Sequence, residues 1–153
     1  MKKLFAFALF AGACFIVYKV AFASSAAYQA YEEFADAMLY DRWDDARKLA
    51  GSDKVERIID DAEALPRRMG ETYRTLRGVV HMGPSRTVVS EKASPDGNKV
   101  TLRVVQEERR GPTTMSPIGK PTVRHRQMAV MALQKGGWKV EEFEDDVEPL
   151  NDR

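Results

Sequence analysis

Few residues in this chain could do acid, base or metal chemistry. It has two histidines, His81 and His125, which lie 44 positions apart and so do not form the closely spaced pair that holds one metal ion. The single cysteine, Cys14, cannot build a thiolate metal site by itself. The chain also lacks a Ser-His-Asp order, a phosphate-binding glycine loop and a nucleotide fingerprint. We therefore predict no metal and no cofactor.

His125 lies in an alternating segment, 122–134, that predicts a β-strand. One face of this strand carries His125 and Gln127, and the other carries Arg124 and Arg126. Because unpaired arginines are costly to bury, we place the His125 face inward. An imidazole and a carboxamide beside apolar groups are typical of a small-ligand pocket, where His125 could act as an acid or base near neutral pH. The full inward set is Val123, His125, Gln127, Ala129, Met131 and Leu133.

A structural role for His125 is the favoured alternative to catalysis. A lone histidine near a strand end is usually satisfied or solvated, and the spacing identifies no carboxylate partner for it. The catalytic residues therefore stay unknown, and a non-enzyme is favoured. Aromatic residues at helical spacing are likewise core residues before they are pocket residues. The residues expected to line a ligand pocket, if there is one, are Tyr31, Trp43, His125, Gln127 and Trp138.

The opposite face of the same strand carries an apolar stripe. With His125 inward, Met128, Val130 and Ala132 face outward beside Val105 of the preceding strand. Apolar patches of this kind often mark a protein contact, so the stripe predicts a protein partner or a homodimer. The alternative is that the proline-rich loop at 111–121 or the C-terminal tail covers it.

Three amphipathic helices are expected to support the strands. Ser24 or Ser25 can cap the first, Asp41 the second and Ser52 the third, while Pro66 limits or kinks the third. The apolar positions at helical spacing are Tyr28, Tyr31, Phe34, Ala35, Met38 and Leu39, then Trp43, Ala46 and Leu49, then Val55, Ile58, Ile59, Ala62 and Leu65.

Two β-hairpins follow the helices. Segments 87–92 and 99–107 flank an Asp-Gly turn, and segments 122–134 and 138–143 flank a Gly-Gly turn. An acidic tail is expected from Glu141 through Glu148, and it ends in residues 149–153, which have few apolar groups to hold them down. The predicted fold class is therefore α+β, with N-terminal amphipathic helices packed on a curved antiparallel sheet of about four strands.

This order of elements resembles the NTF2-like (cystatin-like) superfamily over residues 25–144. The sequence segments that carry the resemblance are the Tyr-Asp-Arg-Trp break between helices at 40–43, with Ala46 and Leu49 after it, and the Trp-Lys-Val strand at 138–140. The resemblance implies a cone with a pocket at its open end, used in some relatives for isomerase or dehydratase chemistry. Many other relatives are binding or assembly modules, and exported ones with a short anchor include scaffold subunits of secretion machines. No active-site motif of the family is present to carry over.

The N-terminal segment predicts export. Two lysines precede an apolar run at 4–18, and Ala21-Phe22-Ala23 before Ser24 fits signal-peptidase cleavage between Ala23 and Ser24. An uncleaved anchor is the alternative, because residues 4–23 are long enough to span a bilayer. A lipoprotein acylated at Cys14 is a third interpretation. Each places the rest of the chain outside the cytoplasm, periplasmic, secreted or membrane-anchored.

Charge and length bound the remaining functions. Removing residues 1–23 takes away three of the 24 basic residues and none of the 23 acidic ones, which leaves a formal charge of −2. This balance excludes a strongly basic nucleic-acid surface, so no nucleic acid is expected as a partner. We assign 1–23 to the signal peptide or anchor, 24–147 to the domain and 148–153 to a short tail.

The predicted function is an exported small binding or assembly domain without catalysis, of unknown specific role. The alternative is a small-ligand carrier, or an isomerase or dehydratase type of enzyme, that uses the cone pocket. The expected partners are a protein or second copy on the outer sheet face, a small apolar ligand, and the membrane through residues 4–23 if they are uncleaved.

Overall fold

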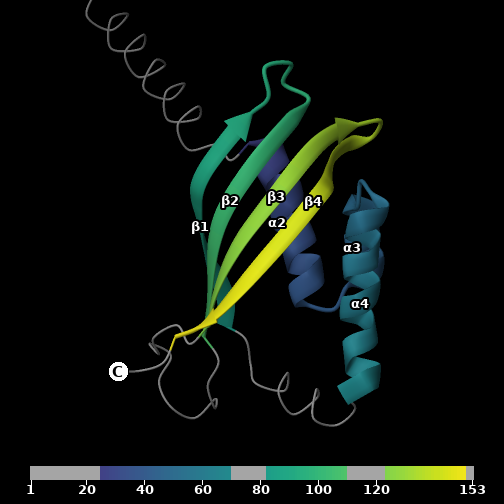
Figure 1. The fold of residues 1–153 in the computed structure, drawn as a ribbon, viewed down its shortest axis with the longest axis vertical. Coiled ribbons are helices and arrows are strands. Elements are labelled where there is room, and N and C mark those ends of the chain that lie inside the picture. The colour runs from purple at the N-terminus through teal and green to yellow at the C-terminus, as the bar shows by residue number, and fades with distance from the viewer. Residues whose placement is uncertain (1–24, 70–81, 110–122, 151–153) are drawn as a thin grey trace, which may run out of the picture.

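The computed structural model describes residues 25–69, 82–109 and 123–150 as three helices and four strands. The strands form one antiparallel sheet in the order β1-β2-β3-β4, which confirms the predicted α+β class. In Figure 1, α2 passes behind the strands, and α3 and α4 stand beside β4. The elements are α2 (Ala26–Leu39), α3 (Trp43–Leu49), α4 (Asp53–Met69), β1 (Met82–Ala93), β2 (Lys99–Arg109), β3 (Val123–Gln134) and β4 (Gly137–Pro149).

Several sequence predictions fall outside these residues: the N-terminal segment with its Ala23–Ser24 cleavage site, the loop at 111–121, and any continuation of the third helix beyond Met69. In the three described ranges, no helix is both long and apolar enough to cross a bilayer.

Two of the three predicted helix caps are confirmed. The Oγ of Ser25 accepts a hydrogen bond from the backbone N–H of Tyr28 at 3.0 Å, and Ser52 does the same for Val55 at 3.3 Å. Asp41 as a cap is wrong. Its φ of 58° places it in the left-handed region, which aspartate tolerates, so it turns the chain before α3 instead. Pro66 does not end α4 either, because the helix continues to Met69.

The core lies between α2 and the inner face of the sheet. Tyr31 and Phe34 of α2 are fully buried, and the ring of Phe34 meets the ring of Phe143 edge to face with centroids 5.2 Å apart. Aromatic pairs of this geometry add to the stabilisation from burial. The other fully buried large side chains are Val55, Ile59, Leu102, Val104, Met131 and Val140.

One backbone and one side-chain hydrogen bond attach the α3–α4 connection to the edge of β4. The N–H of Gly51 donates to the carbonyl of Val140 at 2.8 Å, and the Oγ of Ser52 donates to the carbonyl of Glu141 at 2.6 Å. A Cβ on Gly51 would lie 2.8 Å from the Cβ of Lys139, too close for any larger residue. Glycine at this position therefore lets the helical pair approach the sheet.

β4 is longer than predicted and carries a bulge. It runs to Pro149 rather than ending near Phe143, so part of the acidic stretch is strand and not tail. Val130 pairs with Glu142 while Met131 pairs with Val140, which leaves Glu141 as an extra residue. One extra residue reverses the faces of a strand beyond it, so Phe143 and the residues that alternate with it point inward.

Candidate functional site

A small cavity opens on the inner face of the sheet, where α2 crosses β2, β3 and β4. Its volume is about 180 Å³. The helix and Phe143 supply apolar walls, and the strands supply polar ones. The lining residues are Ala35, Met38, Leu39, Gln106, Glu108, His125, Gln127, Phe143 and Asp145.

Two carboxylates hold His125 in this cavity. Its Nδ1 lies 2.9 Å from Oδ2 of Asp145, within hydrogen-bond distance. Its Nε2 lies 3.2 Å from Oε1 of Glu108, an ion-pair contact whose angle is poor for a hydrogen bond. His125 is 8% exposed and Glu108 is 3% exposed. Both ring nitrogens are therefore directed at acidic groups, of which Glu108 is buried and Asp145 is partly open to solvent.

This arrangement favours the charged form of the imidazole. Burial lowers the pKa of His125, but the contacts with Asp145 and Glu108 outweigh burial and raise the pKa to about 9. The ring therefore carries a proton at neutral pH and is a poor general base there, because an effective base has a pKa near the working pH.

Glu108, one of the two carboxylates that contact His125, also belongs to a network of buried polar groups. Gln106 donates from Nε2 to Glu108 at 2.9 Å and accepts from Nε of Arg86 at 2.7 Å. Nη1 of Arg86 in turn pairs with Asp36 of α2 at 2.7 Å. Each charged side chain in this network of polar groups thus has an opposite charge or a hydrogen-bond partner. A buried charge is tolerated in a protein core only under this condition.

Three of the five predicted pocket residues come together. Gln127 and His125 line the cavity, and the hydroxyl of Tyr31 donates a hydrogen bond to Oε1 of Gln127. Burial raises the pKa of Tyr31, so its phenol stays protonated as a donor. Trp138 does not line the cavity: it pairs with Leu133 next to the β3–β4 turn and packs against the core from there.

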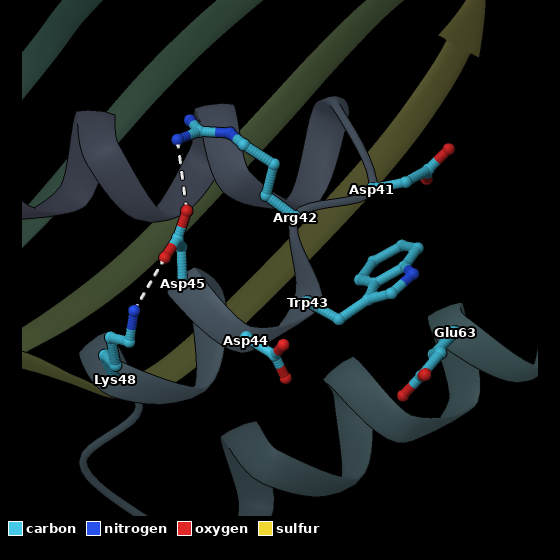
Figure 2. A pocket seen from close by; sticks show the side chains of 7 residues that line it. All are labelled: Asp41, Arg42, Trp43, Asp44, Asp45, Lys48 and Glu63. Atoms are coloured by element: carbon cyan, nitrogen blue, oxygen red, sulfur yellow. Dashed lines mark hydrogen bonds and ion pairs between the residues drawn. The ribbon is translucent and has the colours of Figure 1, made fainter.

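Trp43, the fifth residue, borders a separate surface hollow of about 430 Å³ (Figure 2). Asp45 lies between Arg42 and Lys48 (Figure 2). Its carboxylate oxygens form ion pairs with Arg42 at 3.4 Å and with Lys48 at 2.9 Å. These charges are paired with one another and open to solvent, where such pairs contribute little. The hollow is lined by Asp41, Arg42, Trp43, Asp44, Asp45, Lys48 and Glu63.

Sequence reasoning missed the partners of His125. Glu108 lies one residue beyond the predicted strand segment 99–107, and the proline-rich sequence at 111–121 is too long to predict a tight turn that would fix which residue faces His125. Asp145 lies in the stretch expected to be a tail, and its inward direction depends on the bulge at Glu141. The sequence does carry one signal of that bulge: Phe143 is apolar, although strict alternation from Val140 would place it on the outward face.

The outer face of the sheet carries the second candidate surface. Val105, Met128 and Val130 are half-buried there, as the alternation predicted. Ala132 is buried instead, because Lys99 pairs with it in register and reaches across β3 to Glu141 of β4, so that its aliphatic stem can cover a small side chain. Leu133, predicted to face inward, is 50% exposed beside the turn.

Four cross-strand rows make up the middle of this outer surface, and the exposed Val89 lies beside them at the bulge in β1. Three ion pairs cross it, from Arg124 to Glu107 at 2.8 Å, from Arg126 to Glu148 at 3.0 Å and from Lys99 to Glu141 at 2.6 Å. A groove of about 380 Å³ lies over β1, β2 and β3 at one end. Read from β1 to β4, the rows are Lys92-Thr101-Val130-Glu142, Ser90-Arg103-Met128-Glu144, Thr87-Val105-Arg126-Asp146 and Ser85-Glu107-Arg124-Glu148.

Within the described residues, no group of three or more His, Cys, Asp or Glu side chains could hold a metal ion. No protein-family model matches the chain. No curated protein matches it either. Among solved structures, the chain is similar to the intermembrane space region of chloroplast protein ARC6, at 16% identity and a TM-score of 0.49, over 76% of this chain and 91% of that one. These comparisons do not establish membership in the NTF2-like superfamily.

Proposed function

We propose that this chain is an exported domain of the NTF2-like type that binds a protein partner through the outer face of its sheet. In this proposal the inner cavity has a structural role and does no chemistry. Export is supported by the N-terminal sequence, with its basic start, its apolar run and its small residues before Ser24.

The single observation that carries the proposal is the contact of both ring nitrogens of His125 with carboxylates, Asp145 at Nδ1 and Glu108 at Nε2. A group held on both ring nitrogens by Asp145 and Glu108, with a pKa of about 9, is suited to a fixed charge and not to proton transfer at neutral pH. The cavity volume of about 180 Å³ is also below the range of about 300 to 1,000 Å³ that is usual for ligand pockets. The inner site therefore offers little room for a substrate.

The outer face has the features of a contact surface. In the described part of the chain, the helices pack on the inner face and along the β4 edge, away from Met128 and Val130. These two residues are half-buried and are surrounded by charged residues of both signs, several of which form ion pairs. A modest apolar centre with a polar rim is the usual anatomy of a protein interface.

Val130→Asp is expected to abolish partner binding while leaving the fold intact. The new carboxylate would lie in register with Glu142 and in the middle of the apolar stripe, so affinity should fall at least about tenfold. Met128→Asp should act in the same way. The measurement is co-purification of the partner from the cell envelope, with circular dichroism as the check on folding.

The matched control is Leu65→Asp, which adds the same charge at an exposed leucine of α4 away from the outer face. It should leave binding unchanged. The proposal is wrong if Val130→Asp retains every partner, or if it loses them only because the domain unfolds.

A second function is favoured by the cavity itself, whose carboxylates and carboxamides could anchor a small ligand against Phe143 and Met38. As a carrier, or as an isomerase or dehydratase type of enzyme, the protein would retain a small molecule on purification, and His125→Ala would lose it. Our proposal expects no such molecule in either protein. Mass spectrometry of the denatured eluate distinguishes the two functions.

A further inference from the structure

The charge pattern of the outer face fits a second copy of the same face. We propose that two copies of this chain pack outer face to outer face about a two-fold axis that is parallel to the strands and lies between β2 and β3. This inference rests on the proposed function, since it names the protein that the outer face binds.

The register of the sheet determines which residues such an axis brings together. The rotation reverses each cross-strand row over itself, so β1 lies over β4 of the partner subunit and β2 lies over its β3. In the first row, Lys92 meets Glu142 of the partner subunit; in the last, Glu107 meets Arg124 of the partner subunit. Each of these contacts occurs twice in the dimer.

None of the eight residue pairs opposed in this way has like charges. Besides the two ion pairs, serine or threonine hydroxyls of β1 meet the acidic residues of β4, and hydroxyls can donate to carboxylates. In the centre, Met128 meets Arg103 of the partner subunit and Val105 meets Arg126 of the partner subunit, whose aliphatic stems can pack on apolar groups.

The other two-fold arrangement is unfavourable. An axis across the strands would lay β4 over β4 of the partner subunit, and the outward residues of β4 beyond its bulge are all acidic. Opposed like charges at an interface strongly disfavour association. Those residues are Glu142, Glu144, Asp146 and Glu148. The same residues become complementary when they face β1, which is why the parallel axis is the one proposed.

The size of the face sets the expected strength. Four strands about 4.8 Å apart and about eight residues long at 3.3 Å each cover about 500 Å² per copy. That is at the low end for a specific interface, so the dimer should be reversible, with a dissociation constant in the micromolar range. Because opposite charges contribute, it should also weaken as salt is added.

Lys92 and Glu142 supply the test, because they can interact only between copies. Within one chain they lie three strand spacings apart, about 14 Å, which exceeds the screening length at physiological salt. Packed sheets are rotated by about 30°, which offsets corner residues by a distance that these long, exposed side chains can span.

The experiment compares the full chain, in whichever processed form the cell produces, with Lys92→Glu and Glu142→Lys. Each variant alone opposes like charges twice, so its dissociation constant should rise at least about tenfold in sedimentation equilibrium. An equimolar mixture of the two variants opposes unlike charges at both contacts. It should form a heterodimer with a dissociation constant within about threefold of the wild type.

The control is Glu56→Lys, which makes the same charge change at an exposed position on α4. Mixing it with Lys92→Glu should restore nothing. The inference is overturned if the wild type is monomeric at high concentration, or if the complementary mixture does not reassociate. If the wild type is monomeric while Val130→Asp still loses an envelope protein, the second copy is wrong and the outer-face function stands.

Discussion

Phe34→Ala is expected to lower the free energy of unfolding by about 3 to 5 kcal/mol, the usual cost of removing a fully buried phenylalanine. The ring is fully buried, and it meets Phe143 edge to face across the helix–sheet interface. Because small domains are stable by about 5 to 15 kcal/mol, this single change should unfold a large fraction of the protein on mild heating. Urea denaturation followed by tryptophan fluorescence measures the loss.

Two comparisons interpret the Phe34 result. Phe34→Leu should cost less, because it leaves a smaller cavity, and Leu65→Ala should change stability by no more than about 0.5 kcal/mol, because Leu65 is 44% exposed. A loss below about 1 kcal/mol for Phe34→Ala would mean that α2 does not pack on the sheet as described.

His125 should make stability fall with rising pH. Its folded-state pKa of about 9 lies above the ordinary value of 6.5, so the stabilisation is fully present below pH 6.5 and is lost as pH rises through 9. The size of the shift corresponds to about 3 kcal/mol. His125→Gln should therefore be less stable than the wild type at pH 6 by about this amount, and the difference should shrink by pH 9 and above.

Urea denaturation at pH 6, 7.5 and 9 tests the His125 prediction. Asp145→Asn is the matched variant, because it keeps the imidazole and removes the carboxylate next to Nδ1. This variant should lose less free energy of unfolding than the wild type as pH rises to 9, but it should still lose some, since Glu108 remains. If the free energy of unfolding changed with pH in the same way for the wild type and His125→Gln, the claim that a protonated His125 stabilises the fold would be contradicted.

The helices and hairpins could be predicted because their signals are local. Ser25 and Ser52 precede periodic apolar stretches, and the Asp-Gly and Gly-Gly pairs allow positive φ angles, 71° at Gly97 and 101° at Gly136. The inward side of β3 could also be predicted, because Arg124 and Arg126 would be costly to bury on the other choice. Asp41 was misassigned because a good capping residue is also one that tolerates the left-handed region.

The candidate site could be predicted only in part, because its geometry depends on contacts between distant segments. His125 and Gln127 share a strand, so their common face follows from alternation alone. Glu108 and Asp145 reach His125 through the β2–β3 register and the bulge in β4, and neither is encoded by local spacing. The placement of Trp43 and Trp138 away from the cavity likewise depends on how α3 and the last hairpin pack.

Native mass spectrometry of the protein gently extracted from its own cell envelope tests the central claim most directly. The account predicts a complex with a protein partner, which can be a second copy of the chain. This complex holds no small molecule and is lost in Val130→Asp. A monomer that retains a small molecule, which His125→Ala releases, would contradict it and would make the inner cavity the functional site.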